Sequence, residues 1–426
     1  MVGTLFANPI FLGGLFFLAR AWSIWLPIVL GFIFWSAWTG YVRGYFMSNA
    51  KWILLEIKVP REQTKSPKAM ESILAGINGT NRLGNMWERY WNGWLTAWFS
   101  LEIVGDATGV HFYVRAPEFF KRMVESQIYA QYPACEIRVA EDYTKETPPA
   151  MPTKGWTVWG SEYIHTKPDA YPIRTYEDFE LVGISSKEED TKIDPLSSLV
   201  EFFGTFKGSE RMWLQMVVRA AGEGWIKEGQ AVVDKLGGKK TEGHKPLLGQ
   251  IVGVVDDIIG GVAGSAPPEK SQKPEKFSAG FFGLSPGVIE TLKALERNMQ
   301  KIGFEVGIRW VYLAKNEDYN ALAIPAINGI FKQFASPNLN GFKLNGKVTT
   351  SIDYVFKKTR LAYRQKRLYN AYRWRSFFHP PYRGKTIVLS SEELATIYHF
   401  PGMVVAAPKM ERIEAKRGAA PPNLPI

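Results

Sequence analysis

The longest run of hydrophobic positions in the chain lies at its N-terminal end. Residues 1–19 carry no charge, Arg20 interrupts them, and residues 21–42 add 22 uncharged positions rich in Trp, Leu, Ile and Phe. About 20 such residues are enough for a helix to cross a bilayer. A secretory signal would begin with basic residues, and this stretch has no basic leader. We therefore predict an uncleaved membrane anchor over residues 1–47, made of one or two hydrophobic segments.

Positive charges flank this anchor unevenly. Arg20 stands alone before residues 21–42, whereas four basic residues follow them: Arg43, Lys51, Lys58 and Arg61. Because cytoplasmic flanks carry the excess of Lys and Arg, this pattern places the C-terminal bulk of the chain in the cytoplasm. A single cysteine, Cys135, fits that reducing compartment. Its position beside an expected strand favours a buried, inert thiol.

Residues 51–143 alternate between strand-like and helix-like patterns. The expected strands are 52–59, 98–104, 110–114 and 137–139, and the expected helices begin at Ser66-Pro67 and at Pro117. The order β-α-β-β-α-β is the ferredoxin-like pattern. We assign residues 48–146 to a first ferredoxin-like domain. A Pro-rich joint then opens an expected linker over residues 147–175.

The same order recurs in residues 176–347. We expect strands at 179–184, 212–218 and 304–312, a helix capped by Asp194-Pro195 and another over 318–334. A Gly-rich stretch followed by Pro, Lys and Glu residues interrupts this unit, and we expect a flexible insertion at 221–279. The prediction is an α+β protein with an N-terminal transmembrane helix, two ferredoxin-like units and a basic helical C-terminal arm with a Pro-rich tail over 348–426.

The charge of the chain concentrates in this arm. Between Tyr354 and Ser391 there are ten basic residues and no Asp or Glu, against a formal net charge of +11 for the whole chain. A helix over about 352–374 would form one narrow apolar stripe from Tyr354, Leu361, Leu368 and Tyr372. The basic residues that we expect to contact an anionic partner are Lys357, Lys358, Arg360, Arg364, Lys366, Arg367, Arg373 and Arg375, and the aromatic residues that we expect to stack are Tyr363, Tyr369 and Trp374.

Three interpretations of this basic segment stay open. It can be a solvated helix face above structural aromatic residues, a DNA contact, or a contact with anionic lipid headgroups, because a membrane-tethered domain already lies near the acidic cytoplasmic leaflet. Sharp salt dependence and base stacking would favour the nucleic acid.

The chain shows no catalytic signature. Gly283 to Gly287 matches the G-x-S-x-G nucleophile elbow, but the residue after Ser285 is Pro286, which has no N–H for an oxyanion hole and favours a helix start instead. Neither lysine that follows a glycine, Lys239 or Lys347, has P-loop spacing. The five histidines are scattered without metal-ligand spacing. We expect no enzyme activity and no cofactor.

Several strings resemble a known family: residues 51–60, 111–134, 194–200, 212–219 and 389–402, the last ending in His399-Phe400-Pro401-Gly402. They are similar to the membrane-anchored N-terminal region of bacterial type IV secretion and conjugation-like DNA-transfer ATPases. In those relatives an HFPG-like motif and a PPNLP-like run lead into a motor domain with a P-loop. That motor is not in this sequence, so no ATP-binding residue can be carried over.

The resemblance implies a location and a set of partners. We expect a cytoplasm-facing, non-catalytic subunit in the bacterial cytoplasmic (inner) membrane, which forms homo-oligomers and docks a separate motor ATPase of a DNA-translocation system. DNA is then a candidate ligand of the basic segment. The alternative hypothesis is a structural membrane scaffold whose basic arm binds anionic lipid.

Overall fold

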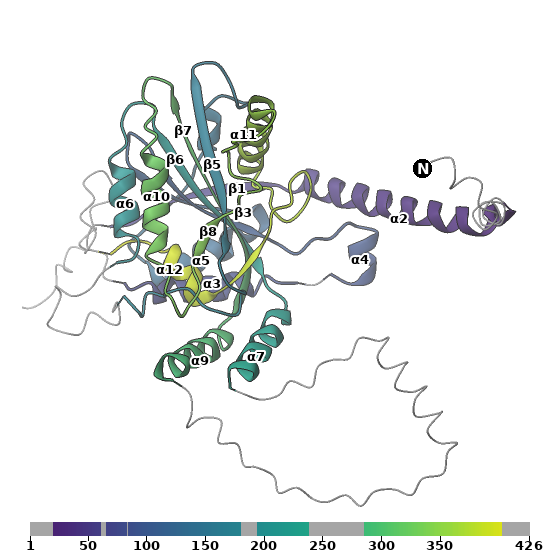
Figure 1. Cartoon of the computed structure of the whole chain (residues 1–426), viewed down its shortest axis with the longest axis horizontal. Coiled ribbons are helices and arrows are strands. Elements are labelled where there is room, and N and C mark those ends of the chain that lie inside the picture. Colours follow the sequence, from purple (N-terminus) through teal and green to yellow (C-terminus); the bar gives the residue numbers. More distant parts are fainter. Residues whose placement is uncertain (1–19, 61–64, 83, 180–193, 238–284, 403–426) are drawn as a thin grey trace, which may run out of the picture.

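The computed structural model describes residues 20–60, 65–82, 84–179, 194–237 and 285–402. These residues form an α+β fold on one antiparallel sheet of nine strands, with helices on both faces (Figure 1). A long helix projects from the sheet at the N-terminal end. The predicted α+β class is therefore confirmed.

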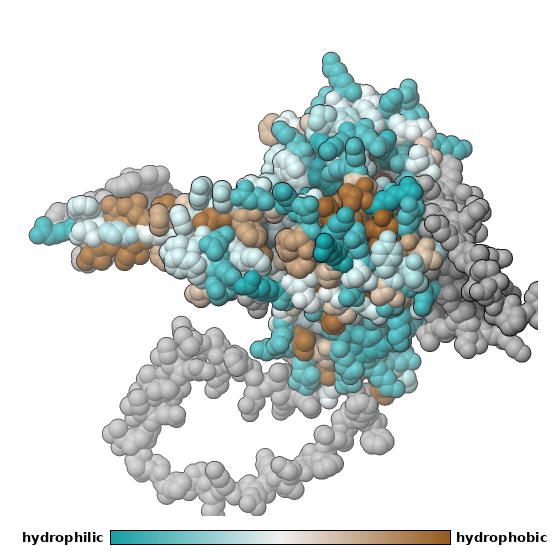
Figure 2. Space-filling model, turned by 180° about the vertical axis from the view of Figure 1, so that it is seen from behind, coloured by the Kyte–Doolittle hydropathy of each residue, from teal (hydrophilic) through white to brown (hydrophobic). Residues whose placement is uncertain are grey.

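The projecting helix is α2, Trp22–Asn49. Among the described residues it is the one helix that is long and apolar enough to cross a membrane, and none of its apolar window is buried. Its exposed side chains include Phe32 and Phe34, and in Figure 2 brown hydrophobic residues alternate with paler ones along the projecting helix. A signal sequence near an N-terminus meets the same criteria of length and composition. Residues 1–19 lie outside the described part, so the possible second segment is not tested.

The first four strands form one half of the sheet in the order β4-β1-β3-β2. They are β1 Trp52–Lys58, β2 Phe99–Gly105, β3 Val110–Pro117 and β4 Glu136–Val139. The helical segments of this half are α3 Lys68–Asn78, α4 Met86–Tyr90, η1 Glu118–Phe120, α5 Lys121–Gln131 and η2 Tyr143–Glu146. All four expected strands are present, with ends within three residues of the prediction.

The next four strands continue the same sheet in the order β6-β7-β5-β8, because β2 pairs with β6 along its whole length. They are β5 Trp156–His165, β6 Arg211–Ala220, β7 Gly303–Lys315 and β8 Phe342–Leu344. The helices are α6 Ser197–Gly204, α7 Gly224–Leu236, α9 Pro286–Met299 and α10 Ala323–Lys332. Ser285 stands at the N-cap of α9, which confirms that this serine starts a helix.

The C-terminal part adds α11 Lys357–Arg373, β9 Ile387–Ser390 and α12 Ser391–Ile397. β9 pairs with β7 beside Gly303 to Val306, next to the part of β7 that β5 occupies. β5 and β9 therefore pair with successive parts of β7.

Three predicted segments differ from the structure or lie partly outside its described residues. Residues 147–175, which we expect to be a linker, hold β5, a central strand that pairs with β7 and β8. This strand is buried on both faces, so its sequence lacks the alternation that marks a half-exposed strand. The strand expected at 179–184 is not seen at Phe179, which lies in a turn, and residues 180–184 are outside the described part. Likewise the expected insertion 221–279 begins with the ordered helix α7, and residues 238–279 are not described.

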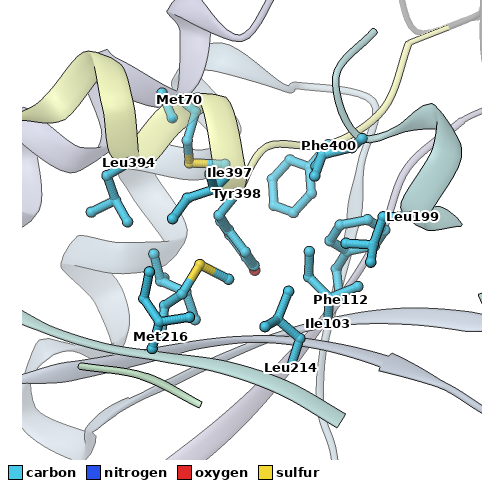
Figure 3. Close-up of a cluster of buried hydrophobic side chains, with 14 of the residues drawn as sticks. Met70, Ile103, Phe112, Leu199, Leu214, Met216, Leu394, Ile397, Tyr398 and Phe400 are labelled. Carbon is cyan, nitrogen blue, oxygen red and sulfur yellow. The ribbon is translucent and has the colours of Figure 1, made fainter. Parts of the chain in front are cut away.

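The main hydrophobic core fills the face of the sheet under α3, α5, α6, α10 and α12. Figure 3 shows side chains of the strands, such as Ile103, Phe112 and Met216, meeting Tyr398 and Phe400. The Tyr398 hydroxyl donates a hydrogen bond of 3.0 Å to the carbonyl oxygen of Tyr113. The segment that ends in His399-Phe400-Pro401-Gly402 is thus a core element of the fold.

Phe112→Ala tests this core. Phe112 is 1% exposed, and we expect its truncation to lower the free energy of unfolding by about 3–5 kcal/mol, since it removes buried surface and leaves a cavity. The matched control is Phe119→Ala, because Phe119 is 67% exposed. Thermal unfolding of both full-length variants in detergent measures the difference. Equal losses of stability would contradict the packing.

His111 makes stability depend on pH. Its Nδ1 lies 3.0 Å from Glu56 Oε1 and its Nε2 lies 3.8 Å from Asp106 Oδ1. Burial opposes the charged imidazolium, but attraction to Asp106 and Glu56 outweighs it and raises the pKa of His111 to about 9. Because this pKa is higher folded than unfolded, the stabilisation is full below about pH 6.5 and is lost as the pH rises through 9.

We expect the free energy of unfolding to fall by roughly 3 kcal/mol between pH 6.5 and 9.5. Urea titrations in detergent at several pH values measure it. His111→Gln removes the titrating group, so its stability should stay level over this window. An equal slope in both proteins would exclude His111 as the cause.

Candidate functional site

The basic helix α11 packs on the face of the sheet opposite the main core. Its C-terminal half is held by Leu368, Tyr369 and Tyr372, which are buried against Trp213, Val311 and Leu313 of β6 and β7. Gly160 in β5 permits this approach, because a Cβ there would lie 2.8 Å from Leu368 Cδ2. The N-terminal half of α11 is mostly exposed. The predicted stripe is therefore confirmed at Leu368 and Tyr372, whereas Tyr354 is 53% exposed and lies before the helix.

A row of polar side chains crosses the centre of the sheet beneath α11. The register places Glu102 opposite Gln215, Gln215 opposite Arg309, and Arg309 opposite Glu162, on β2, β6, β7 and β5. All four residues are completely buried. Buried charges are costly unless they are paired and hydrogen-bonded. The row therefore needs partners from another part of the chain.

Arg375 supplies the partner at one end of the row. Its guanidinium donates hydrogen bonds of 3.0 and 3.2 Å to Glu102 and two to Asp142, one of them 3.0 Å long. The Tyr143 hydroxyl donates to Glu102 at 2.6 Å. Burial alone would raise the pKa of Glu102, but the charge of Arg375 outweighs this and holds that pKa below its usual value. Glu102 is therefore an ionised carboxylate in the middle of the fold.

The segment after α11 covers the other end of the row. Tyr382 donates a hydrogen bond of 2.6 Å to Glu162, and Arg309 donates one of 2.7 Å to the carbonyl oxygen of Ser376. The Arg309 guanidinium lies over the rings of Phe377 and Tyr382, at 4.8 and 5.0 Å from their centroids. Burial raises the pKa of Glu162, although Arg309 opposes the shift. These contacts fix residues 375–382 on the sheet, so they also fix the C-terminal end of α11.

Two of the predicted contact residues need correction. Arg375 is 1% exposed and is used by Glu102 and Asp142, so it is not available to a polyanion. Tyr369 is completely buried and donates a hydrogen bond of 2.7 Å to the carbonyl oxygen of Pro148, so it cannot stack on a base. A helical wheel could not separate these residues from their exposed neighbours, because their partners come from distant parts of the chain.

Two further residues of the predicted contact set form hydrogen bonds within the fold. Arg364 donates to the carbonyl oxygens of Thr349, Gly346 and Ser351, at 2.8 to 3.2 Å. Arg373 donates to the carbonyl oxygen of Pro149. Both arginines support the loops beside α11, and any contact with a ligand would compete with these bonds.

The remaining predicted residues are exposed together. Tyr363 and Trp374 are 62% and 57% exposed. The exposed basic residues of this surface, which we call the α11 surface, are Lys357, Lys358, Arg360, Lys366 and Arg367. Lys357 Nζ lies 3.6 Å from Asp353, at the start of the helix.

A hollow opens in the α11 surface beside residues 347–354. Its volume is about 160 Å³ and its lining includes Lys347, Tyr354, Arg360, Tyr363 and Arg367. The Arg360 guanidinium lies 5.0 Å from the centroid of the Tyr354 ring. Cations and aromatic faces in one hollow suit a phosphate group and an adjoining flat ring. Within the described ranges no cluster of His, Cys, Asp and Glu could hold a metal ion.

Comparison with known protein families identifies the chain's relatives. Residues 46–412 match the family described as "Domain of unknown function (DUF8128)". The chain belongs to this family. No curated protein matches it. The DUF8128 region begins near the C-terminal end of α2 and contains the whole sheet, the polar row and the α11 surface.

The polar row of this DUF8128 domain is not among the sites that the sequence pattern predicts. Its members are Glu102, Gln215, Arg309 and Glu162, and each lies in the interior of a mostly apolar strand. A charged or amide side chain inside such a strand is the signal that could have identified them. Their alignment across the sheet depends on strand order, which spacing along the chain does not give.

Arg375→Met tests the ion pair on which α11 depends in the DUF8128 domain. Without Arg375, Glu102 stays buried without its cation, and we expect a loss of about 3–5 kcal/mol in the free energy of unfolding. Arg383→Met is the control, because Arg383 lies in the same segment and is exposed. Chemical unfolding in detergent measures both variants.

A second substitution separates charge from packing. Adding Glu102→Gln to Arg375→Met removes the unpaired charge, so part of the lost stability should return. If Arg375→Met were as stable as Arg383→Met, the ion pair would not hold the fold together.

Proposed function

We propose that this DUF8128 protein is a membrane-anchored, non-catalytic subunit of a type IV secretion or conjugation-like DNA-translocation system. In this proposal α2 crosses the cytoplasmic membrane, the sheet lies in the cytoplasm, and the α11 surface contacts DNA beside a separate motor ATPase. The family resemblance of strings such as residues 111–134 and 389–402 supports the context. The length and composition of α2 support the anchor.

The observation that carries the DNA contact is the rigid, unbalanced charge of the α11 surface. Five basic residues are exposed on one helix, and the sequence from Tyr354 to Ser391 has no Asp or Glu, although Asp353 just before this stretch pairs with Lys357. The buried Arg375–Glu102 pair, with its 3.0 Å contact, holds this helix on the sheet. Exposed Tyr363 and Trp374 add flat faces beside the charges. This combination of cations and aromatic rings suits a single-stranded or locally opened nucleic acid.

We further propose that the sheet is built from two ferredoxin-like units. In each half the first strand lies between the third and the fourth, and the second strand lies on the inner side: β4-β1-β3-β2 and β8-β5-β7-β6. This order supports a duplicated unit, joined where β2 pairs with β6. The second unit would then begin at β5, within residues 147–175, and α7 and α9 would belong to the insertion between its second and third strands.

A second candidate function is a scaffold that binds anionic lipid. The position of α11 favours it, because α11 and α2 lie on the same side of the sheet in Figure 1. The segment after α11 also lies near Arg43 of α2: burial and the charges of Arg219, Arg383 and Arg43 lower the pKa of His379 to about 4. A basic surface on the membrane side would meet the acidic leaflet.

Reversal of four exposed charges tests the α11 surface. In Lys358→Glu, Arg360→Glu, Lys366→Glu and Arg367→Glu combined, we expect DNA affinity to be lost at moderate salt. The slope of log affinity against log salt should fall by up to about 3 for single-stranded DNA, since each neutralised phosphate of a single strand contributes about 0.7. Fluorescence anisotropy of labelled DNA with the full chain in nanodiscs of neutral lipid measures both.

The control reverses the same number of exposed charges elsewhere: Arg122→Glu, Lys227→Glu, Lys235→Glu and Lys332→Glu. This variant should bind DNA nearly as well as the unmodified chain. Unchanged binding by the α11 variant would exclude the assignment. Nanodiscs that contain acidic lipid separate the two candidates, because a surface that faces headgroups would lose DNA affinity by competition, whereas a surface that faces the cytoplasm would not.

A further inference from the structure

The short helix α4 lies against the membrane-spanning candidate α2, away from the sheet (Figure 1). The Trp38 indole donates a hydrogen bond of 3.0 Å to the carbonyl oxygen of Tyr90. The rings of Trp35 and Tyr90 lie 5.4 Å apart. Gly93 has a φ of 68°, and a Cβ there would lie 2.2 Å from the carbonyl oxygen of Val42, so only glycine permits this approach. The hairpin over residues 84–95, which we call the α4 hairpin, is therefore fixed to α2.

An apolar groove opens between the α4 hairpin and α2. Its volume is about 320 Å³, and it is lined by Trp35, Met86, Trp87, Tyr90 and Trp91. Met86 is 70% exposed and Trp87 is 62% exposed, although both are large and apolar. Trp87 stacks on Trp91 with 4.9 Å between ring centroids. Exposed apolar patches of this kind mark a binding surface rather than a solvated one.

Charged residues in and just before the α4 hairpin indicate that one of its sides faces water. Arg82 and Glu88 form an ion pair of 2.5 Å, and the Glu88 carboxylate also accepts the Asn85 backbone N–H at the start of α4. The Arg82 guanidinium lies over the ring of Trp94. None of these residues lines the groove. The hairpin is therefore amphipathic, with its aromatic side toward Trp35.

The position of the groove along α2 indicates what occupies the groove. Trp35 and Trp38 precede Val42, the last residue of the uncharged stretch, by seven and four positions. At 1.5 Å per residue the hairpin meets α2 about 6–10 Å inside the end of that stretch. This is the depth of about 5–10 Å at which interfacial helices rest in a bilayer. Tyrosine and tryptophan are also the residues enriched at this level.

We infer that the α4 hairpin is a second membrane contact and that its groove holds a phospholipid acyl chain at the cytoplasmic interface. This inference rests on the proposed crossing of the membrane by α2. Trp35 is both a wall of the groove and part of the apolar surface of α2, so a bilayer around α2 at this level also covers the groove. A second contact beside α2 prevents rotation of the sheet about the helix axis and fixes which side of the protein faces the membrane.

Spin labels at single cysteines test the inference. In a Cys135→Ala background, Met86→Cys reports on the hairpin, Phe32→Cys on α2 and Lys332→Cys on the water-exposed body; all three native side chains are exposed. The full-length chain is reconstituted in phosphatidylcholine and phosphatidylglycerol vesicles. Collision of each label with oxygen, which partitions into lipid, is compared with collision with a water-soluble nickel chelate.

We expect the ratio of oxygen to nickel collisions to be highest at position 32 and lowest at position 332. At position 86 the ratio should be at least three times that at position 332. A lipid-like signal at position 32 with a water-like signal at position 86 would overturn the α4 inference and leave the anchor intact. A water-like signal at position 32 would instead refute the proposed crossing and the inference with it. Dipolar broadening between position 86 labels on two chains would show that a second copy fills the groove, which also overturns the inference.

Discussion

The ion pair between Arg375 and Glu102 is the interaction on which the arrangement of this protein depends. Glu102 lies in the middle of the sheet and is completely buried, so an ionised carboxylate there would destabilise the fold without a cation. The cation comes from a residue 273 positions further along the chain. The first half of the sheet therefore cannot reach its final state before the C-terminal segment arrives. The basic helix that precedes Arg375 is placed by the same event.

The C-terminal segment also joins the two faces of the sheet. Residues 375–382 cover the polar row on the α11 side, β9 then pairs with β7, and Tyr398 and Phe400 enter the main core on the other side. His399 Nε2 lies 3.1 Å from Asp194 Oδ1, which ties this end to the start of α6. The HFPG-like motif is consequently explained by packing within the domain.

The sequence was sufficient for the elements whose patterns are local. β3 and β7 alternate visibly, α3 and α5 have clear starts, and the helix expected over about 352–374 is observed as α11, which begins five residues later. β5 was missed because both of its faces are buried, so it has no alternation to detect. For the α11 surface, the sequence gives the number of charged residues, but it does not show which of their side chains are exposed. Arg367 and Arg375 are alike in sequence, and only the strand that carries Glu102 decides that one is exposed and the other is buried.

Several of these contacts determine how the α11 surface is oriented relative to α2. A single helix in a bilayer leaves its soluble domain free to rotate, and a basic surface on such a domain would face the membrane only part of the time. Two contacts bear on this orientation, since one holds the sheet domain to α2 and the other holds the segment after α11 to the sheet. Gly93 brings the α4 hairpin against Val42 of α2, and Trp98, at 4.9 Å from Trp52 and 5.6 Å from His379, links the sheet to the segment that follows α11. The direction of the α11 surface relative to α2 is therefore set by the packing of Gly93 and of these aromatic residues.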